Sequence, residues 1–125
     1  MEAMNQSTAA IGKAGEDAAA AYLEEAGYRI IERNVRLGKY EIDIIAEDRL
    51  RQMLVFVEVK SRTGFDPRYP LRTAVDRRKR SALRQAVARW VNAHQFEGSA
   101  RTDVVGVFGS SVVEHIMDLG AEVWC

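Results

Sequence analysis

The sequence predicts an α/β domain in which two helices cover a mixed β-sheet, with the elements in the order αβββαββ. Segments with helical and with strand-like hydrophobic periods alternate along the chain. Turn-forming residues separate these segments, and there are no repeats, low-complexity stretches or domain linkers. A chain of 125 residues can bury one hydrophobic core but not two. We therefore expect a flexible tail over residues 1–7 and a single domain over residues 8–125.

The first half of the chain predicts one helix and three strands. Residues 8–26 place apolar side chains at helical spacing, and a glycine follows as a stop signal. Residues 28–37 and 40–47 are typical of two strands around a glycine turn, and residues 52–62 form a third, strongly β-prone strand. The apolar stripe expected on the helix consists of Ile11, Ala18, Ala19, Tyr22, Leu23 and Ala26.

The second half predicts another helix and two closing strands. Thr73 and Asp76 have the spacing of a capping box, and the helix that they open should run to about His94. Strands over residues 101–109 and 111–119 follow, joined by a Gly-Ser turn, while the last six residues predict no element. The core-facing positions of this helix are Leu83, Val87, Trp90 and Val91.

Composition places the chain among ordinary globular proteins, with 47% hydrophobic and 29% charged residues. No run approaches the ~20 apolar residues that span a bilayer, so we expect no membrane association. The first ten residues lack the basic and apolar regions of a signal peptide. The only cysteine is Cys125, which excludes an internal disulfide framework and a cysteine-based zinc site. A cytoplasmic location is the simplest expectation.

The net charge of zero conceals an uneven distribution of charge. Between Lys60 and Arg89 there are ten Lys or Arg residues and only two acids, so the rest of the chain is acidic. Such an asymmetry predicts a surface that binds a polyanion. A solvated basic helix without a ligand is the alternative.

Charged residues interrupt two of the predicted strands. Asp43 lies in "EIDII", and Glu58 and Lys60 lie in "VFVEVK". Burying such groups without partners costs several kcal/mol, so something must compensate them. If the intervening turn centres between Leu50 and Arg51, Asp43 lies opposite Glu58, and Glu41 lies opposite Lys60. Opposed residues of this kind have Cβ atoms about 5 Å apart.

Two opposed carboxylates repel each other, and a divalent cation between them would remove the repulsion. Asp43, Glu58 and the backbone carbonyl of Val59 are hard oxygen ligands of the kind that Mg²⁺ or Mn²⁺ prefers. Lys60 shares a strand face with Glu58 and could orient or deprotonate an attacking water. The alternative is a lattice of cross-strand ion pairs, Glu41 with Lys60 and Arg62 with Glu58.

The D…E-x-K arrangement resembles the PD-(D/E)xK core of restriction endonucleases and Holliday-junction resolvases. The whole chain resembles the YraN-type family of small bacterial proteins, which has this endonuclease-like fold. The matching segments span Gly12 to Val107 and include "GKAGEDAAAAYLEEAGY", "ERNVR", "YEIDIIAED", "LVFVEVKSR", "AVDRRKRSALRQAVARWV" and "RTDVVGV". The resemblance implies a restriction-endonuclease-like, three-layer α/β/α fold. Tyr40 and Thr102 depart from the pattern, which usually has Gly and Phe there, and Tyr40 could narrow access to the site.

The resemblance also implies that Glu16 on the first helix completes the metal site, although a surface acid near a helix start is the alternative. Lys79 falls on the inward stripe of the second helix and could reach the site or a phosphate, or extend to the helix edge. For Asp103 we expect a structural hydrogen-bonding role. His94 and His115 lie far from the motif and receive no role.

Together these observations predict a metal-dependent nuclease that hydrolyses phosphodiester bonds in DNA; whether the DNA is branched or a junction is left open. Basic side chains would hold the DNA backbone through phosphate contacts that do not read sequence. A nucleic-acid-binding protein without catalysis, or a protein-interaction module that keeps the fold, is the alternative, and a homodimer is left open. The expected phosphate contacts are Arg62, Arg77, Arg78, Lys79, Arg80 and Arg84.

Overall fold

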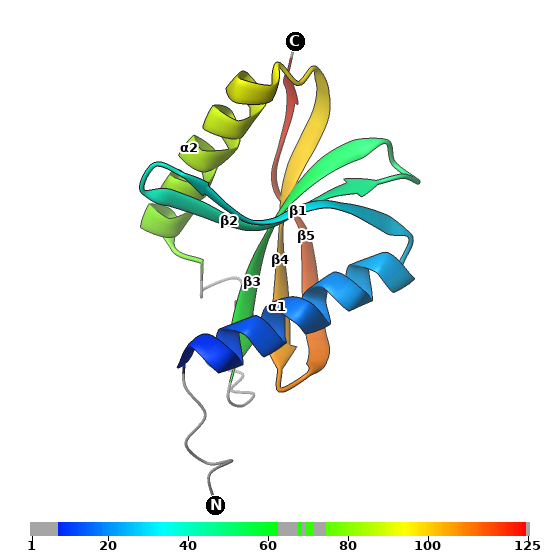
Figure 1. Cartoon of the computed structure of the whole chain (residues 1–125), viewed down its shortest axis with the longest axis vertical. Coiled ribbons are helices and arrows are strands. Elements are labelled where there is room, and N and C mark those ends of the chain that lie inside the picture. The colour runs from blue at the N-terminus through cyan, green and yellow to red at the C-terminus, as the bar shows by residue number, and fades with distance from the viewer. Residues whose placement is uncertain (1–7, 63–67, 69, 72–74, 125) are drawn as a thin grey trace, which may run out of the picture.

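The protein, described by a computed structural model over residues 8–62, 68, 70–71 and 75–124, has the predicted order of two helices and five strands (Figure 1). The predicted tail at residues 1–7 lies outside the described part. None of the described helices is long and apolar enough to cross a membrane. The elements are α1 (Thr8–Glu25), β1 (Tyr28–Leu37), β2 (Tyr40–Asp48), β3 (Met53–Arg62), α2 (Arg77–His94), β4 (Gly98–Phe108) and β5 (Ser111–Trp124).

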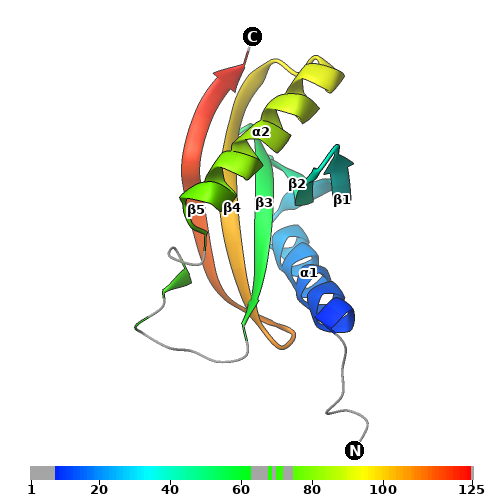
Figure 2. The ribbon, with the colours of Figure 1, turned by 90° about the vertical axis from the view of Figure 1, so that its left-hand side faces the viewer.

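The five strands form one mixed sheet in the order β1-β2-β3-β4-β5. Neighbouring strands are antiparallel except β3 and β4, which are parallel and are connected by the segment that contains α2. A parallel pair needs such a crossover because the chain must return to the same end of the sheet. The two helices lie on opposite faces of the sheet (Figure 2), so the predicted α/β class with a mixed sheet is confirmed.

Each helix covers its own hydrophobic cluster. Under α2, Phe56 and Ile45 of the sheet pack with Trp90 and its helical neighbours, and the four predicted core positions of α2 are all buried. Under α1, Leu23 packs against the valines of β3 and β4. Because α1 crosses the strands rather than running along them (Figure 1), the ends of its predicted stripe are exposed, and Ile11 is 39% accessible.

Two predicted boundaries are wrong for reasons of long-range pairing and capping. Strand β5 continues to Trp124 because its last residues pair with the start of β4, where Gly98 lies opposite Trp124. Helix α2 begins at Arg77, and Asp76 is its N-cap, with a carboxylate oxygen that accepts the Lys79 N–H at 2.9 Å. Asp76 therefore has the capping position itself. Thr73, the predicted cap, lies outside the described residues.

The sheet forks between β2 and β3. Their paired register runs from Asp48–Met53 to Ile44–Val57 and ends there. Beyond this point β2 stays paired with β1, while β3 continues alongside β4 as far as Arg62. The two strands therefore diverge (Figure 1), and the charged residues predicted to form the site lie where they part.

Candidate active site

Asp43 and Glu58 lie next to each other at the fork. The predicted register is confirmed over the paired residues, and the step after Ile44–Val57 brings Asp43 to Glu58. The Asp43 Oδ2 atom accepts the backbone N–H of Val59 at 2.8 Å, which fixes the carboxylate against β3. Glu58 is buried, with only 6% of its surface exposed. Two acidic groups are thus held close together at the edge of a hydrophobic core.

The environment disfavours a negative charge on Asp43. Burial, followed by repulsion from Glu58, raises the pKa of Asp43 from 3.8 to about 7, although the Val59 N–H acts in the opposite direction. Glu16 and Glu41 add smaller repulsive contributions to the same rise. Asp43 therefore keeps its proton up to about pH 7, and an added positive charge would stabilise its carboxylate form.

Two lysines supply positive charge to Glu58. The Nζ atoms of Lys60 and Lys79 lie 3.8 and 3.3 Å from Glu58 Oε2. Lys79 therefore reaches the site from α2, which was one of its two predicted positions. The predicted pairing of Glu41 with Lys60 is wrong, because β2 and β3 have already diverged there, and Glu41 pairs with Arg36 of β1 at 3.5 Å. The side chain of Arg62 lies outside the described part of the structure.

Glu16 of α1 lies near enough to Asp43 to add a small repulsive contribution to its raised pKa. The helix approaches β3 closely at the preceding residue, Gly15, where an added Cβ would lie 2.2 Å from Ser61 Oγ. Glu16 is 8% exposed, and its Oε1 atom accepts hydrogen bonds from Asn34 Nδ2 at 2.8 Å and from Arg33 Nε at 3.1 Å. No role was predicted for Arg33 or Asn34, although both lie in the "ERNVR" segment.

The donor types fit a hard divalent cation, but a full ligand set is not assembled. Among the described residues, no three His, Cys, Asp or Glu side chains are grouped closely enough to hold a metal ion. Asp43, Glu58 and Glu16 are each engaged by N–H groups or ammonium groups of the protein instead. Buried carboxylates with mutual repulsion are nevertheless the chemistry that Mg²⁺ or Mn²⁺ compensates. The predicted metal site therefore remains a prediction.

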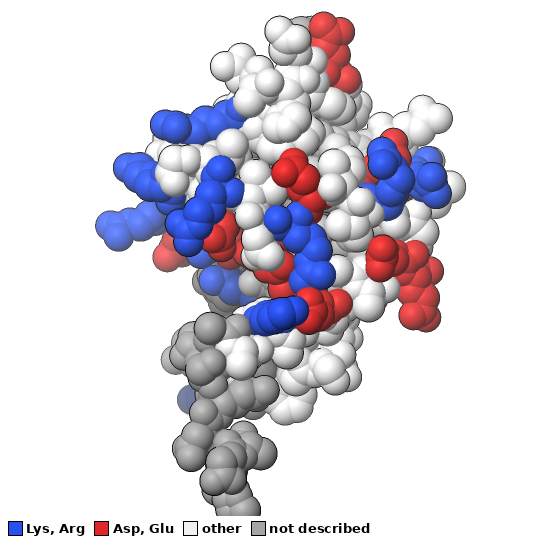
Figure 3. Space-filling model, in the orientation of Figure 1, with Lys and Arg blue, Asp and Glu red and all other residues white. Residues whose placement is uncertain are grey.

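Helix α2 presents a basic face beside this site. Among residues that the structure describes, Arg77, Arg78 and Arg84 are exposed and form no ion pair with an acid. Arg80 is partly buried, and its Nε donates to the Val75 carbonyl. Figure 3 shows Lys and Arg side chains gathered on the side of the molecule where α2 lies. The charge asymmetry seen in the sequence thus becomes a local positive surface.

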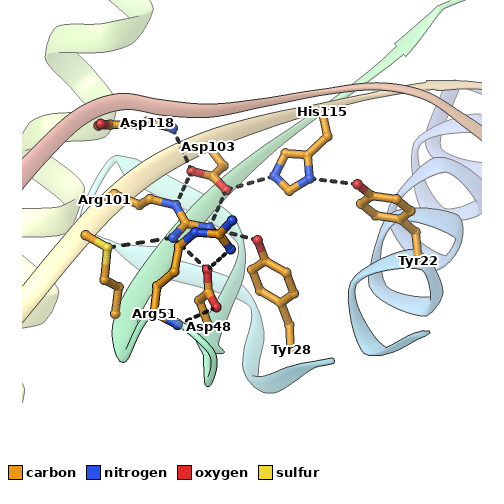
Figure 4. Close-up of polar contacts among 9 residues, drawn as sticks. Tyr22, Tyr28, Asp48, Arg51, Arg101, Asp103, His115 and Asp118 are labelled. Atoms are coloured by element: carbon orange, nitrogen blue, oxygen red, sulfur yellow. Dashed lines mark hydrogen bonds and ion pairs between the residues drawn. The ribbon is translucent and has the colours of Figure 1, made fainter. Parts of the chain in front are cut away.

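A second polar cluster links residues of β2, β4 and β5 to Tyr22 of α1, and its contacts indicate a structural role (Figure 4). Arg101, 3% exposed, bonds Asp48 at 2.8 Å and Asp103 at 2.9 Å, so a buried cation is matched by two buried carboxylates. His115 bonds Asp103 through Nε2 and Tyr22 through Nδ1, both at 2.8 Å. The structural role expected for Asp103 is confirmed, whereas the role of His115 was missed.

Hydrogen bonds offset the cost of burying these acids. Burial alone would raise the pKa of Asp103, but the bonds from His115, Arg101 and the Asp118 N–H together lower it. The pKa of Asp48 is likewise lowered, because Arg101 and Arg51 outweigh its burial. The pKa of Asp103 is lowered and that of Asp43 is raised, which distinguishes a structural acid compensated by cations from a partly buried acid that faces a second carboxylate.

Comparison with known proteins gives a consistent family match. A family model described as uncharacterised protein family UPF0102 matches residues 15–107, which include the three carboxylates of the site. UPF0102 proteins from Prosthecochloris aestuarii and Trichlorobacter lovleyi are 39% and 38% identical over 117 and 121 residues. These alignments cover 86% and 93% of this chain and 91% and 94% of the two relatives.

The chain also has a distant structural similarity. A crystal structure described as an fdxN element excision controlling factor protein from Anabaena variabilis aligns with a TM-score of 0.45 and 15% identity. The alignment covers 83% of this chain and 98% of that one. A similarity at this level supports no conclusion about fold or function.

Proposed function

The chain belongs to the uncharacterised protein family UPF0102, and we propose that it is a metal-dependent nuclease that hydrolyses phosphodiester bonds in DNA, within a restriction-endonuclease-like fold. The observation that carries the proposal is the pair of adjacent carboxylates at the fork, buried Glu58 and partly buried Asp43, with the pKa of Asp43 raised to about 7. A purely structural sheet has no need of such a pair, since it is destabilising in the absence of a cation. Lys60 and Lys79 lie beside Glu58, where their ammonium groups could offset the charge of a phosphate.

Asp43, Glu58, Glu16 and the carbonyl of Val59 would hold Mg²⁺ or Mn²⁺. When bound, such an ion supplies the positive charge that activates water and stabilises the developing charge on a phosphodiester. Lys60 contributes a further positive charge from the same strand as Glu58. Its ammonium orients the attacking water and offsets the charge on the phosphate in the transition state.

The basic face of α2 would hold the DNA backbone. Among the described residues, Arg77, Arg78 and Arg84 are exposed and form no ion pair with an acid, so they are available to phosphates. Contacts to phosphate position a substrate without reading its sequence, so we expect little sequence preference. Branched DNA, such as a four-way junction, would require two active sites for symmetric cleavage, and on that substrate we expect the protein to act as a homodimer. The proposed contacts are Arg62, Arg77, Arg78, Lys79, Arg80 and Arg84.

A nucleic-acid-binding protein without catalysis is the second candidate, and a docking surface for an acidic protein is a further version of it. Two observations favour them: Glu58 is already compensated by two lysines, and no set of three ligands is grouped in the described residues. The basic face of α2 would suffice for binding of either kind. Binding alone, however, gives no reason for the raised pKa of Asp43.

The experiment that tests the proposal is incubation of the pure protein with duplex, single-stranded and four-way-junction DNA. Each substrate is tested with Mg²⁺, with Mn²⁺ and with EDTA. We expect cleavage of at least one substrate with a divalent cation and none with EDTA. Binding without cleavage under every condition would instead favour the second candidate.

A further inference from the structure

Two consecutive residues of β1 bind the same carboxylate oxygen. Arg33 Nε and Asn34 Nδ2 lie 3.1 and 2.8 Å from Glu16 Oε1, and Arg33 Nη2 is also 3.1 Å from it. In a regular strand, neighbouring side chains point to opposite faces and could not converge in this way. The backbone of Asn34 resolves the conflict, because its φ of 54° lies in the left-handed region. That departure brings both side chains to Glu16.

The irregularity is shared by the neighbouring strand. Arg33 pairs with Ile44 and Val35 pairs with Ile42, so Asn34 lies across from Asp43. The regular alternation of β2 is also broken there, since Ile42 and Ile44 belong to clusters on opposite faces of the sheet. Bulges and left-handed residues of this kind reorient side chains near functional sites. The distorted region thus includes one proposed ligand and the residue that binds another.

The contacts to Glu16 are one-sided. Among the described residues, all of its side-chain bonds are to Oε1, and none is to Oε2. Donors that hold one oxygen of a carboxylate fix its orientation and leave the other oxygen for a ligand, as outer-shell partners do at metal sites. Glycine would satisfy the left-handed backbone alone, whereas asparagine tolerates this conformation and also supplies a donor.

We infer that Asn34, together with Arg33, is a positioning residue for Glu16, holding its Oε1 so that Oε2 is free to bind the divalent cation beside Asp43. This inference rests on the proposed metal site. Asn34 itself does not touch the cation or the substrate. Its effect is on the affinity for the cation, through the orientation of the Glu16 carboxylate.

Asn34→Gly separates this role from a merely structural one. Glycine accepts the left-handed backbone without strain and removes the side chain together with its carboxamide donor. We expect Asn34→Gly to unfold cooperatively in EDTA, as wild type does, and to bind Mn²⁺ about tenfold more weakly by titration calorimetry. Gln95→Gly is the matched control, because Gln95 has a similar φ of 51° but caps the far end of α2. Its Mn²⁺ affinity should equal that of wild type.

Arg33→Met provides a second test that does not depend on the folding of Asn34→Gly. It removes the other donor to Oε1 and should also weaken Mn²⁺ binding, with the double variant weaker than either single one. If wild type binds Mn²⁺ and both single variants bind it equally well, the positioning role is wrong while the metal site stands. If wild type binds no Mn²⁺, both the metal site and the positioning role are wrong.

Discussion

Neutralising Asp43 should stabilise the metal-free protein at neutral pH. The pKa of Asp43 is 3.8 in an unfolded chain and about 7 in the folded one. Because the folded value is raised, the group favours folding most below pH ~4, and this contribution is lost as the pH rises to about 7. At 1.36 kcal/mol per pKa unit, the penalty at pH 8 is at most about 4 kcal/mol. Asp43→Asn removes the charge and keeps an oxygen that can accept the Val59 N–H.

The assay is urea denaturation at pH 5 and pH 8 in EDTA. We expect the free energy of unfolding of wild type, relative to Asp43→Asn, to fall by about 2–3 kcal/mol between these two values. The comparison removes the contributions of other titrating groups, which both proteins share. Asp17→Asn is the control. Hydrogen bonds from Arg33 and Lys13 lower the pKa of Asp17, so the stability of wild type relative to this variant should not fall between pH 5 and pH 8. The reasoning is refuted if Asp43→Asn is less stable than wild type at pH 8.

Three further outcomes are expected. Millimolar Mn²⁺ or Mg²⁺ should raise the melting temperature of wild type and have a smaller effect on Asp43→Asn, and equal melting curves with Mn²⁺ and with EDTA would count against the site. Replacing Arg77, Arg78 and Arg80 together by Gln should weaken DNA binding for all sequences alike and flatten its salt dependence. The control Arg29→Gln breaks an exposed ion pair with Glu47 and should leave both the DNA affinity and its salt dependence unchanged. Asp103→Asn should destabilise the fold by about 3–5 kcal/mol in urea, because it leaves the buried charge of Arg101 short of a partner; a loss below 1 kcal/mol would contradict the structural role of this cluster.

The elements with strong local patterns could be predicted from the sequence. Residues 28–37 contain several strand-forming residues and are followed by a glycine with a φ of 68°, so both the strand and its turn are encoded locally. The register that brings Asp43 to Glu58 followed from the short turn between β2 and β3, since a hairpin fixes its own pairing. The two central acids of the site were therefore accessible without a structure.

Features that depend on distant contacts could not be predicted. The last residues of β5 have no clear strand pattern, and only their pairing with the start of β4 makes them a strand. Tyr22 and His115 are 93 positions apart, so no local spacing relates them. The divergence of β2 and β3, which separates Glu41 from Lys60, reflects the competing pairings with β1 and β4. The left-handed backbone of Asn34 likewise needs Glu16 on another element to explain it.

Metal-dependent cleavage by wild type and by Lys60→Ala tests the central claim most directly. Lys60→Ala removes one positive charge near Glu58 and leaves all three carboxylates in place, so the variant should still bind Mn²⁺ and DNA. Lys39→Ala, at the β1–β2 turn, is the matched lysine control. We predict that wild type and the control cleave DNA with Mn²⁺ and that Lys60→Ala is slower by about 10²–10³-fold. No metal-dependent cleavage by wild type, or equal cleavage by Lys60→Ala, would contradict the proposal.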